Sequence, residues 1–215
     1  MIRLRRGTRL VIATHNPGKA AEFGELLAPW GIDCVAAGTL GLPAPAETAP
    51  DFAGNARIKA LAAAEASQLP ALADDSGIAV AALAGAPGVN SARFAEEAGG
   101  YPAAMAKILA EIRDDRRAAF VCALCLATPD GETATFQGEA RGTLAREPRG
   151  SRGFGYDPIF IPDRETRSFA ELTQAEKNTR SHRAAAFRQI ASACLEPDDR
   201  GEARPGAPPL DPAGA

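Results

Sequence analysis

The segment Leu69-Pro-Ala-Leu-Ala-Asp-Asp-Ser-Gly77 joins a short apolar run to two adjacent carboxylates, Asp74 and Asp75. A second apolar run, Ile78 to Leu83, follows, so the pattern predicts a strand, a tight acidic turn and another strand. Because neighbouring side chains of a strand point to opposite faces, the two carboxylates cannot both face a core. An Asp at the mouth of a buried strand can hold a hard cation or orient a water molecule. An ordinary Asp-rich turn would use the same residues, since Asp, Ser and Gly favour turns.

The composition is that of a globular protein of 215 residues, with 46% hydrophobic and 24% charged residues. This length suits one large domain or two lobes around a sizeable core. The formal net charge of −3 argues against a broad basic face for nucleic acid, so no nucleic-acid partner is expected. A local basic pocket for a small polyanion remains compatible with that charge.

The N-terminal segment has the basic-then-apolar order of a signal peptide, with Arg3, Arg5 and Arg6 before Leu10–Ala13. The apolar part is too short for that role, and no stretch approaches the ~20 apolar residues of a membrane span. The sequence therefore predicts a cytoplasmic protein without a membrane partner. Residues 196–215 are rich in Pro, Gly, Ala and Asp, and we expect a disordered tail there.

A possible anion site follows the predicted strand Arg9–Ala13, in the sequence Thr14-His-Asn-Pro-Gly-Lys19. Asn16 is a good helix N-cap, and Pro17 suits the first helical position. Free backbone N–H groups at a helix start, beside a lysine, can bind phosphate. The segment lacks the Walker pattern, and an ordinary capped helix with a solvated Lys19 is the alternative.

Two further segments carry polar residues. The Gly-, Pro- and Ala-rich segment 38–50 is predicted to be a loop that contains Glu47, and a lone glutamate in a loop is usually solvated. The predicted helix 51–68 carries Asn55 and Lys59 four residues apart, which places them on one face. That face either projects toward the acidic segment or is a solvated polar stripe. Residues 84–93 are predicted to continue as loop, and residues 102–113 to form a helix.

The C-terminal half offers a flat ring and a basic pair. Strands are expected at 118–127 and 133–141, antiparallel to each other, and glycines flank Phe154 in Gly150-Ser-Arg-Gly-Phe-Gly-Tyr-Asp-Pro158. The ring of Phe154 can stack on a ligand or fold into the core. Thr173–Glu176 fits a capping box for a short helix, and Ser181 can cap the last helix. His182 and Arg183 then lie in its first turn, where they either meet a ligand or are solvated.

Four stretches now stand in order: Thr14-x-Asn16-x-x-Lys19, Ala73-Asp-Asp-Ser-Gly77, Gly153-Phe-Gly-Tyr-Asp-Pro158 and Ser181-His-Arg183. Together they closely resemble the RdgB-like family of non-canonical purine nucleoside triphosphate pyrophosphatases, also called inosine triphosphate pyrophosphatases. The similarity runs from about Leu10 to Leu195. The resemblance implies an α/β fold, with a mixed β-sheet, flanking helices and two lobes around a central cleft. One such domain is expected over residues 7–195.

The resemblance also implies an activity. The family hydrolyses inosine, deoxyinosine and xanthosine triphosphates (ITP, dITP and XTP) to the monophosphate and pyrophosphate, uses Mg²⁺ and usually works as a homodimer. Asp75 would act on the attacking water, Glu47 and Asp75 would hold Mg²⁺, and Asp74 and Asn55 would support that segment. The substrate-binding residues carried over are Thr14, His15, Asn16, Pro17, Gly18, Lys19 and Lys59 for the triphosphate, with Ser76, and Phe154, Gly155, Tyr156, Asp157, Lys177, His182 and Arg183 for the purine.

Two other functions are compatible with parts of this pattern. A Maf-type pyrophosphatase would act on pyrimidine or modified nucleotides, but the Phe154 stretch and Ser181-His-Arg183 match the purine family. A non-catalytic nucleotide-binding protein would need no water-activating carboxylate, whereas the sequence has both Glu47 and Asp75. The expected chemistry is metal-assisted hydrolysis at the α-phosphorus.

Overall fold

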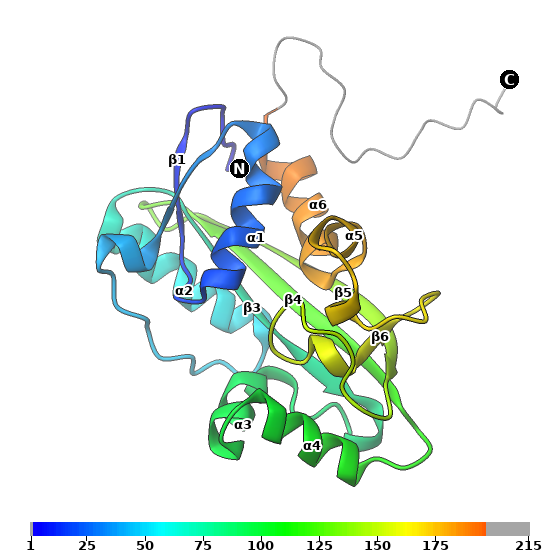
Figure 1. Cartoon of the computed structure of the whole chain (residues 1–215). Coiled ribbons are helices and arrows are strands. Elements are labelled where there is room, and N and C mark those ends of the chain that lie inside the picture. Colours follow the sequence, from blue (N-terminus) through cyan, green and yellow to red (C-terminus); the bar gives the residue numbers. More distant parts are fainter. Residues whose placement is uncertain (1, 197–215) are drawn as a thin grey trace, which may run out of the picture.

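The computed structural model describes residues 2–196, which form a six-stranded sheet with helices on both faces (Figure 1). The strand order is β2-β1-β3-β4-β5-β6. Strands β2, β1 and β3 are parallel, whereas β3, β4, β5 and β6 pair antiparallel, so the sheet is mixed as predicted. The strands are β1 (Arg9–Ile12), β2 (Asp33–Ala36), β3 (Ala71–Val80), β4 (Arg117–Ala127), β5 (Thr133–Leu144) and β6 (Phe160–Pro162).

Within residues 2–196, six α-helices pack around the sheet. Several of them begin at the N-caps that the sequence indicates. Asn16, Asp51, Thr173 and Ser181 each accept a hydrogen bond from a backbone N–H of the following turn, which satisfies an otherwise unpaired donor. The helices are α1 (Pro17–Leu27), α2 (Phe52–Ser67), α3 (Ser91–Ala98), α4 (Tyr101–Glu111), α5 (Gln174–Arg180) and α6 (His182–Cys194).

The helices bury three apolar clusters against the sheet. Phe23 of α1 and Phe187 of α6 belong to the cluster on one face, and the alanines of α2 belong to the cluster on the other. A third cluster lies at the far end of the long strands, where Ile108 of α4 packs with Phe120 and Phe160. The first two clusters form one lobe and the third forms a second lobe, at the bottom of the view in Figure 1.

A cleft opens between the lobes because two neighbouring strands differ in length. Strand β1 pairs with β3 only at Val11↔Ala71 and Ile12↔Leu72, and then turns away into α1. Strand β3 continues to Val80, paired on its other side with β4 over its whole length. Beyond Leu72, β1 no longer covers the edge of β3 until Gly88 and Ser91 approach it at Gly77, and the two carboxylates lie in this interval.

The predicted acidic turn at Asp74–Gly77 is wrong. Strand β3 runs without interruption through these residues, because each of them pairs with a residue of β4. Glycine is required at position 77 of this strand because another segment packs against it. A Cβ atom on Gly77 would collide with the carbonyl oxygen of Gly88 and the hydroxyl of Ser91. Gly77 thus marks a close approach of the α3 segment to the strand.

The other predicted segments agree with the structure to different degrees. The predicted loop at 84–93 is wrong in its last residues, since α3 begins at Ser91, whose side chain accepts from the backbone N–H of Ile78. The expected helix 102–113 is α4, shifted by a residue or two. The predicted tail lies outside the described residues, apart from Glu196. No helix within 2–196 has the length and apolarity to span a membrane.

Candidate active site

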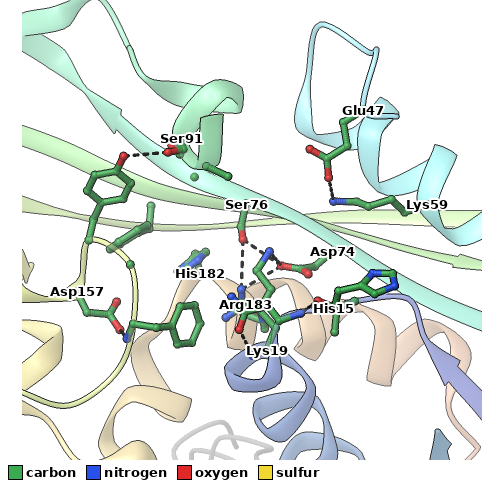
Figure 2. Close-up of a pocket in the computed structure, with 18 of the residues that line it drawn as sticks. His15, Lys19, Glu47, Lys59, Asp74, Ser76, Ser91, Asp157, His182 and Arg183 are labelled. Atoms are coloured by element: carbon green, nitrogen blue, oxygen red, sulfur yellow. Dashed lines mark hydrogen bonds and ion pairs between the residues drawn. The ribbon is translucent and has the colours of Figure 1, made fainter. Parts of the chain in front are cut away.

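A cavity of about 300 Å³ lies in the cleft and collects side chains from both lobes (Figure 2). Most of the predicted site residues line it, from segments that are far apart in the sequence. These are Thr14, His15, Asn16, Lys19, Glu47, Lys59, Asp74, Ser76, Phe154, Gly155, Tyr156, Asp157, Lys177, His182 and Arg183. Four predicted residues do not line the cavity: Pro17 and Gly18 lie in the first turn of α1, Asp75 contacts Lys59, and Asn55 contacts Asp75. The walls also include Ser91, Tyr101 and Phe120, which the sequence did not indicate.

The start of α1 has the geometry of an anion site. The side chain of Asn16 accepts a hydrogen bond from the backbone N–H of Lys19 at 3.2 Å, and Pro17 occupies the first turn, as predicted. Pro17 has no N–H and the N–H of Ala20 bonds to the carbonyl oxygen of Asn16, so the N–H of Gly18 is the group of this turn left for an anion. Gly18 lies where a Cβ atom would come within 3.0 Å of the Phe154 ring, so the two lobes approach each other closely here.

Asp74 faces α1 and α6 and is the centre of a buried charge network. Its Oδ2 lies 2.9 Å from Lys19 Nζ and 3.0 Å from Arg183 Nη2, and it accepts a hydrogen bond from Ser76 at 3.0 Å. Burial alone would raise the pKa of Asp74, but the charges of Lys19, Arg183 and Lys59 outweigh it and hold that pKa well below its usual range. Asp74 is therefore an anion that fixes two cations at the cavity wall.

Glu22 completes this network, and the sequence analysis missed it. Its carboxylate forms an ion pair with Arg183 Nη1, and both side chains are almost fully buried. Gln174 donates to the other carboxylate oxygen. Nothing in the local sequence separates Glu22 from Glu25, which is exposed on the same helix. The signal is tertiary, because Arg183 comes from α6, 161 residues away.

Asp75 faces α2, on the opposite side of the strand from Asp74, as the alternation of a strand requires. Asn55 donates to Asp75 Oδ2 at 3.3 Å, and Lys59 Nζ lies 3.1 Å from Oδ1. Burial raises the pKa of Asp75, the charge of Lys59 opposes this, and the nearby Glu47 carboxylate raises that pKa further. The predicted shared face of Asn55 and Lys59 thus meets the acidic segment.

Glu47 and Asp75 offer hard oxygen donors to a divalent cation. In this structure they share a cation already, because Lys59 Nζ lies 2.5 Å from Glu47 and 3.1 Å from Asp75 (Figure 2 shows the Lys59–Glu47 pair). The described residues contain no group of three or more His, Cys, Asp or Glu side chains suited to a metal. Two carboxylates fit Mg²⁺ bound together with a phosphate ligand, since Mg²⁺ sites use one or two carboxylates plus substrate oxygens.

The loop after β5 presents an aromatic ring on a fixed support. Asp157 Oδ2 accepts from the backbone N–H of Phe154 at 2.9 Å and from Lys177 Nζ at 2.7 Å. Gly153 has a φ of +74°, and a Cβ atom there would collide with the Asp157 carboxylate, so this loop requires glycine. Lys177 Nζ lies 4.5 Å from the centre of the Phe154 ring. Phe154 is half-buried and lines the cavity rather than filling the core.

His182 and Arg183 begin α6 and are buried, not solvated. The imidazole of His182 stacks on Phe120, with ring centres 4.8 Å apart and an interplanar angle of 11°. Burial lowers the pKa of His182 well below its usual value, and the charges of Arg183 and Lys177 lower it further. Within residues 2–196, His182 Nδ1 and Arg183 Nε are the buried side-chain polar atoms that have no hydrogen-bond partner. Both residues line the cavity, although these two atoms themselves are buried.

The fold and the cavity define an α/β protein whose cleft offers cations, carboxylates and one aromatic ring to a single small anionic ligand. The chain belongs to the Ham1 family, whose model matches residues 10–193. The resemblance seen in the sequence is confirmed by this match and by the relatives described next.

The similar curated proteins carry the same name. A "dITP/XTP pyrophosphatase" from Gluconobacter oxydans is 52% identical over 91% of this chain and 95% of its own length. A protein of the same name from Bradyrhizobium diazoefficiens is 53% identical over 88% of this chain and 96% of its own. A HAM1 protein structure from Coxiella burnetii superimposes with a TM-score of 0.79 at 40% identity, covering 86% of this chain and 98% of that one.

Proposed function

We propose that the protein hydrolyses non-canonical purine nucleoside triphosphates (ITP, dITP and XTP) to the monophosphate and pyrophosphate. Such a reaction removes deaminated purines from the nucleotide pool before they enter DNA or RNA. The observation that carries the proposal is that one cavity combines Lys19, Lys59, Glu47 and the Phe154 ring, and that Asp75 pairs with Lys59 beside it. The names of the relatives support the same reaction.

The triphosphate would lie at the start of α1. Lys19 and Lys59 both line the cavity and supply positive charge from two sides. Thr14 and Asn16 shape the turn, while His15, Pro17 and Gly18 supply its backbone. Asp74 holds Lys19 in place through an ion pair, which offsets part of the positive charge of Lys19. The phosphate and Asp74 would therefore share this lysine.

The water would be activated beside Asp75. Burial and Glu47 raise the pKa of this carboxyl, which makes Asp75 a better proton acceptor than an exposed aspartate. Asn55 fixes its second oxygen. Mg²⁺ held by Glu47 and Asp75 would offset the charge that develops on the phosphate oxygens. Ser76 is placed to contact the ligand on the opposite face of β3, beside Asp74.

The purine would stack on Phe154, with Gly155 and Tyr156 forming the adjacent wall. Hypoxanthine and xanthine carry an acceptor oxygen at position 6, where adenine has an amino donor. Lys177 and His182 can donate there, and Asp157 keeps Lys177 in position. Glu22, Asp74 and Ser76 occupy both terminal nitrogens of Arg183, and its Nε is buried, so Arg183 would contribute positive charge to this wall. Adenine would leave these donors unpaired, which gives strong discrimination.

The test is pyrophosphate release measured against ITP, dITP, XTP, GTP, ATP and dTTP, each with and without Mg²⁺. We expect turnover of the first three, which requires Mg²⁺, and little turnover of ATP or dTTP. Preference for dTTP would favour the Maf-type alternative, and tight binding of ITP without turnover would favour a nucleotide-binding protein.

We also propose that the protein is a homodimer in the cytoplasm with no nucleic-acid partner. Light scattering of the full chain tests whether it is a dimer.

A further inference from the structure

Lys59 has an unusual position for a substrate-binding lysine. It reaches from α2 between two carboxylates, 2.5 Å from Glu47 Oε1 and 3.1 Å from Asp75 Oδ1. The lysine side chain is only 14% exposed, and that of Asp75 is 8% exposed. The Glu47 side chain is 34% exposed, so water screens the repulsion between the two carboxylates only in part, and a cation at the point between them is stabilising.

The ammonium and a metal ion cannot occupy that point together. Mg²⁺ binds carboxylate oxygens at about 2.0–2.1 Å, inside the distances that Lys59 Nζ keeps from the same two carboxylates. The carboxylates that the proposed function assigns to Mg²⁺ are thus already neutralised by the chain itself. Lys59 must withdraw from at least one of them when a metal binds.

A second place for the ammonium exists on the same cavity. Lys59 and Lys19 both line its wall, so the volume that the triphosphate would fill lies next to the Lys59 side chain. A phosphate oxygen there would replace the carboxylate as partner of Lys59. The four-carbon stem of a lysine allows such a move without backbone change.

We propose that Lys59 is the resident cation of the Glu47–Asp75 pair and is exchanged for Mg²⁺ when a triphosphate binds, which makes metal and substrate bind cooperatively. This inference rests on the proposed function for the identity of the metal and the substrate. In the free protein Lys59 competes with the metal; with substrate present, the phosphate holds Lys59 away and the competition ends. Coupling of this kind is typically 5- to 150-fold in affinity.

The first test measures binding of Mg²⁺ alone to the full chain by calorimetry. Lys59→Gln removes the competing ammonium, so we expect it to bind Mg²⁺ about tenfold or more tightly than the wild-type protein. Lys59→Arg keeps a cation and should bind Mg²⁺ as weakly as the wild-type. Lys19→Gln is the matched control, because it removes one positive charge from the same cavity but pairs with Asp74.

Lys19→Gln should tighten Mg²⁺ binding much less than Lys59→Gln does. Equal effects of the two variants would reduce Lys59 to a general electrostatic contribution and overturn the proposal. So would a Lys59→Gln variant that is folded by circular dichroism and binds Mg²⁺ no better than the wild-type protein.

The second test measures the coupling. The factor by which Mg²⁺ tightens binding of a non-hydrolysable α,β-imido-ITP should be larger in the wild-type than in Lys59→Gln, because only the wild-type releases a lysine. Equal factors would contradict the exchange. Pyrophosphate release by the wild-type enzyme is assayed separately: its failure removes the proposed function, whereas failure of the Mg²⁺ comparison with turnover intact removes only the exchange.

Discussion

Two adjacent carboxylates in one strand have different surroundings and therefore different roles. Asp74 is held ionised among Lys19 and Arg183, whereas Asp75 faces Lys59 and Glu47 and has a raised pKa. The sequence predicts their separation, because strand side chains alternate between faces. It does not predict which of them is more deeply paired, because Lys19 and Arg183 approach from helices remote in the chain.

The assignment of Asp75 predicts the effect of a single substitution. Asp75→Asn keeps the size and a hydrogen-bonding side chain but removes the proton acceptor. Pyrophosphate release from ITP should fall about a hundredfold or more, while binding of a non-hydrolysable analogue is largely kept. Asp114→Asn changes an exposed aspartate in the same way and should have no effect. Unchanged turnover in Asp75→Asn would remove this residue from the mechanism.

His182 predicts a pH dependence of stability. Its pKa is lowered by burial, so below the ordinary pKa of about 6.5 the unfolded chain takes up a proton that the folded chain does not. The unfolded state then binds more protons, and stability falls as the pH falls. Between pH 7.5 and 5.5 the wild-type protein should lose about 1 kcal/mol more free energy of unfolding than His182→Gln. Urea titrations at both pH values measure this, and equal losses would show that His182 titrates normally.

At the scale of elements, the capped helices and alternating strands were predictable, and the path of β3 was not. The caps at Asn16, Thr173 and Ser181 act over one turn, so local sequence determines them. Strand β3 instead passes through Asp74–Gly77 because β4 pairs with every residue of it, and no local pattern contains that partner. The helix at Ser91 was missed for a similar reason, since Ile78 and Tyr156 both bond to that residue.

Close packing of α6 on β5 positions His182 and Arg183 and can be tested by substituting glycines. A Cβ atom on Gly138 would collide with the carbonyl oxygen of His182 and the backbone of Ala186, so α6 lies directly on the strand. Gly138→Ala should cost about 3 kcal/mol of unfolding free energy. Gly24→Ala is the matched change in α1, where nothing lies within 4 Å of the new atom, and should stabilise by about 0.5–1 kcal/mol. Chemical denaturation of both variants measures these changes. An unchanged unfolding free energy in Gly138→Ala would contradict this packing.

At the scale of the molecule, the packed structure begins before the segment that resembles the family. Ile2 and Leu4 are buried in the same cluster as Phe187 of α6, and the backbone of Leu4 bonds to Cys194 and Glu196. The sequence gives no sign of this, because basic residues surround these two apolar ones. The extent of the domain, expected over residues 7–195, stays a prediction.

The buried N-terminal segment predicts a loss of stability far from the cavity. Leu4→Ala should lower the free energy of unfolding by about 2–5 kcal/mol, because it removes buried methyl groups and leaves a cavity. Arg3→Ala, at an exposed neighbouring position, should change it by less than about 0.5 kcal/mol. The specific activity of folded Leu4→Ala at 25 °C should equal that of the wild-type. Similar denaturation midpoints for both variants would contradict a structural role for Leu4.

Many residues of the cleft could be predicted from the sequence, but the contacts between them could not. Four short motifs contain more than half of the residues that line it, whereas the ion pairs that connect them, above all Glu22 with Arg183, depend on tertiary contacts. The placement of the lysines and carboxylates around one volume is the property from which the proposed reaction follows.

The most direct measurement is phosphorus NMR of ITP incubated with the full chain and Mg²⁺. Attack at the α-phosphorus predicts inosine monophosphate and pyrophosphate in equal amounts, with no diphosphate intermediate. Inosine diphosphate with orthophosphate, or intact ITP after prolonged incubation, would contradict the account.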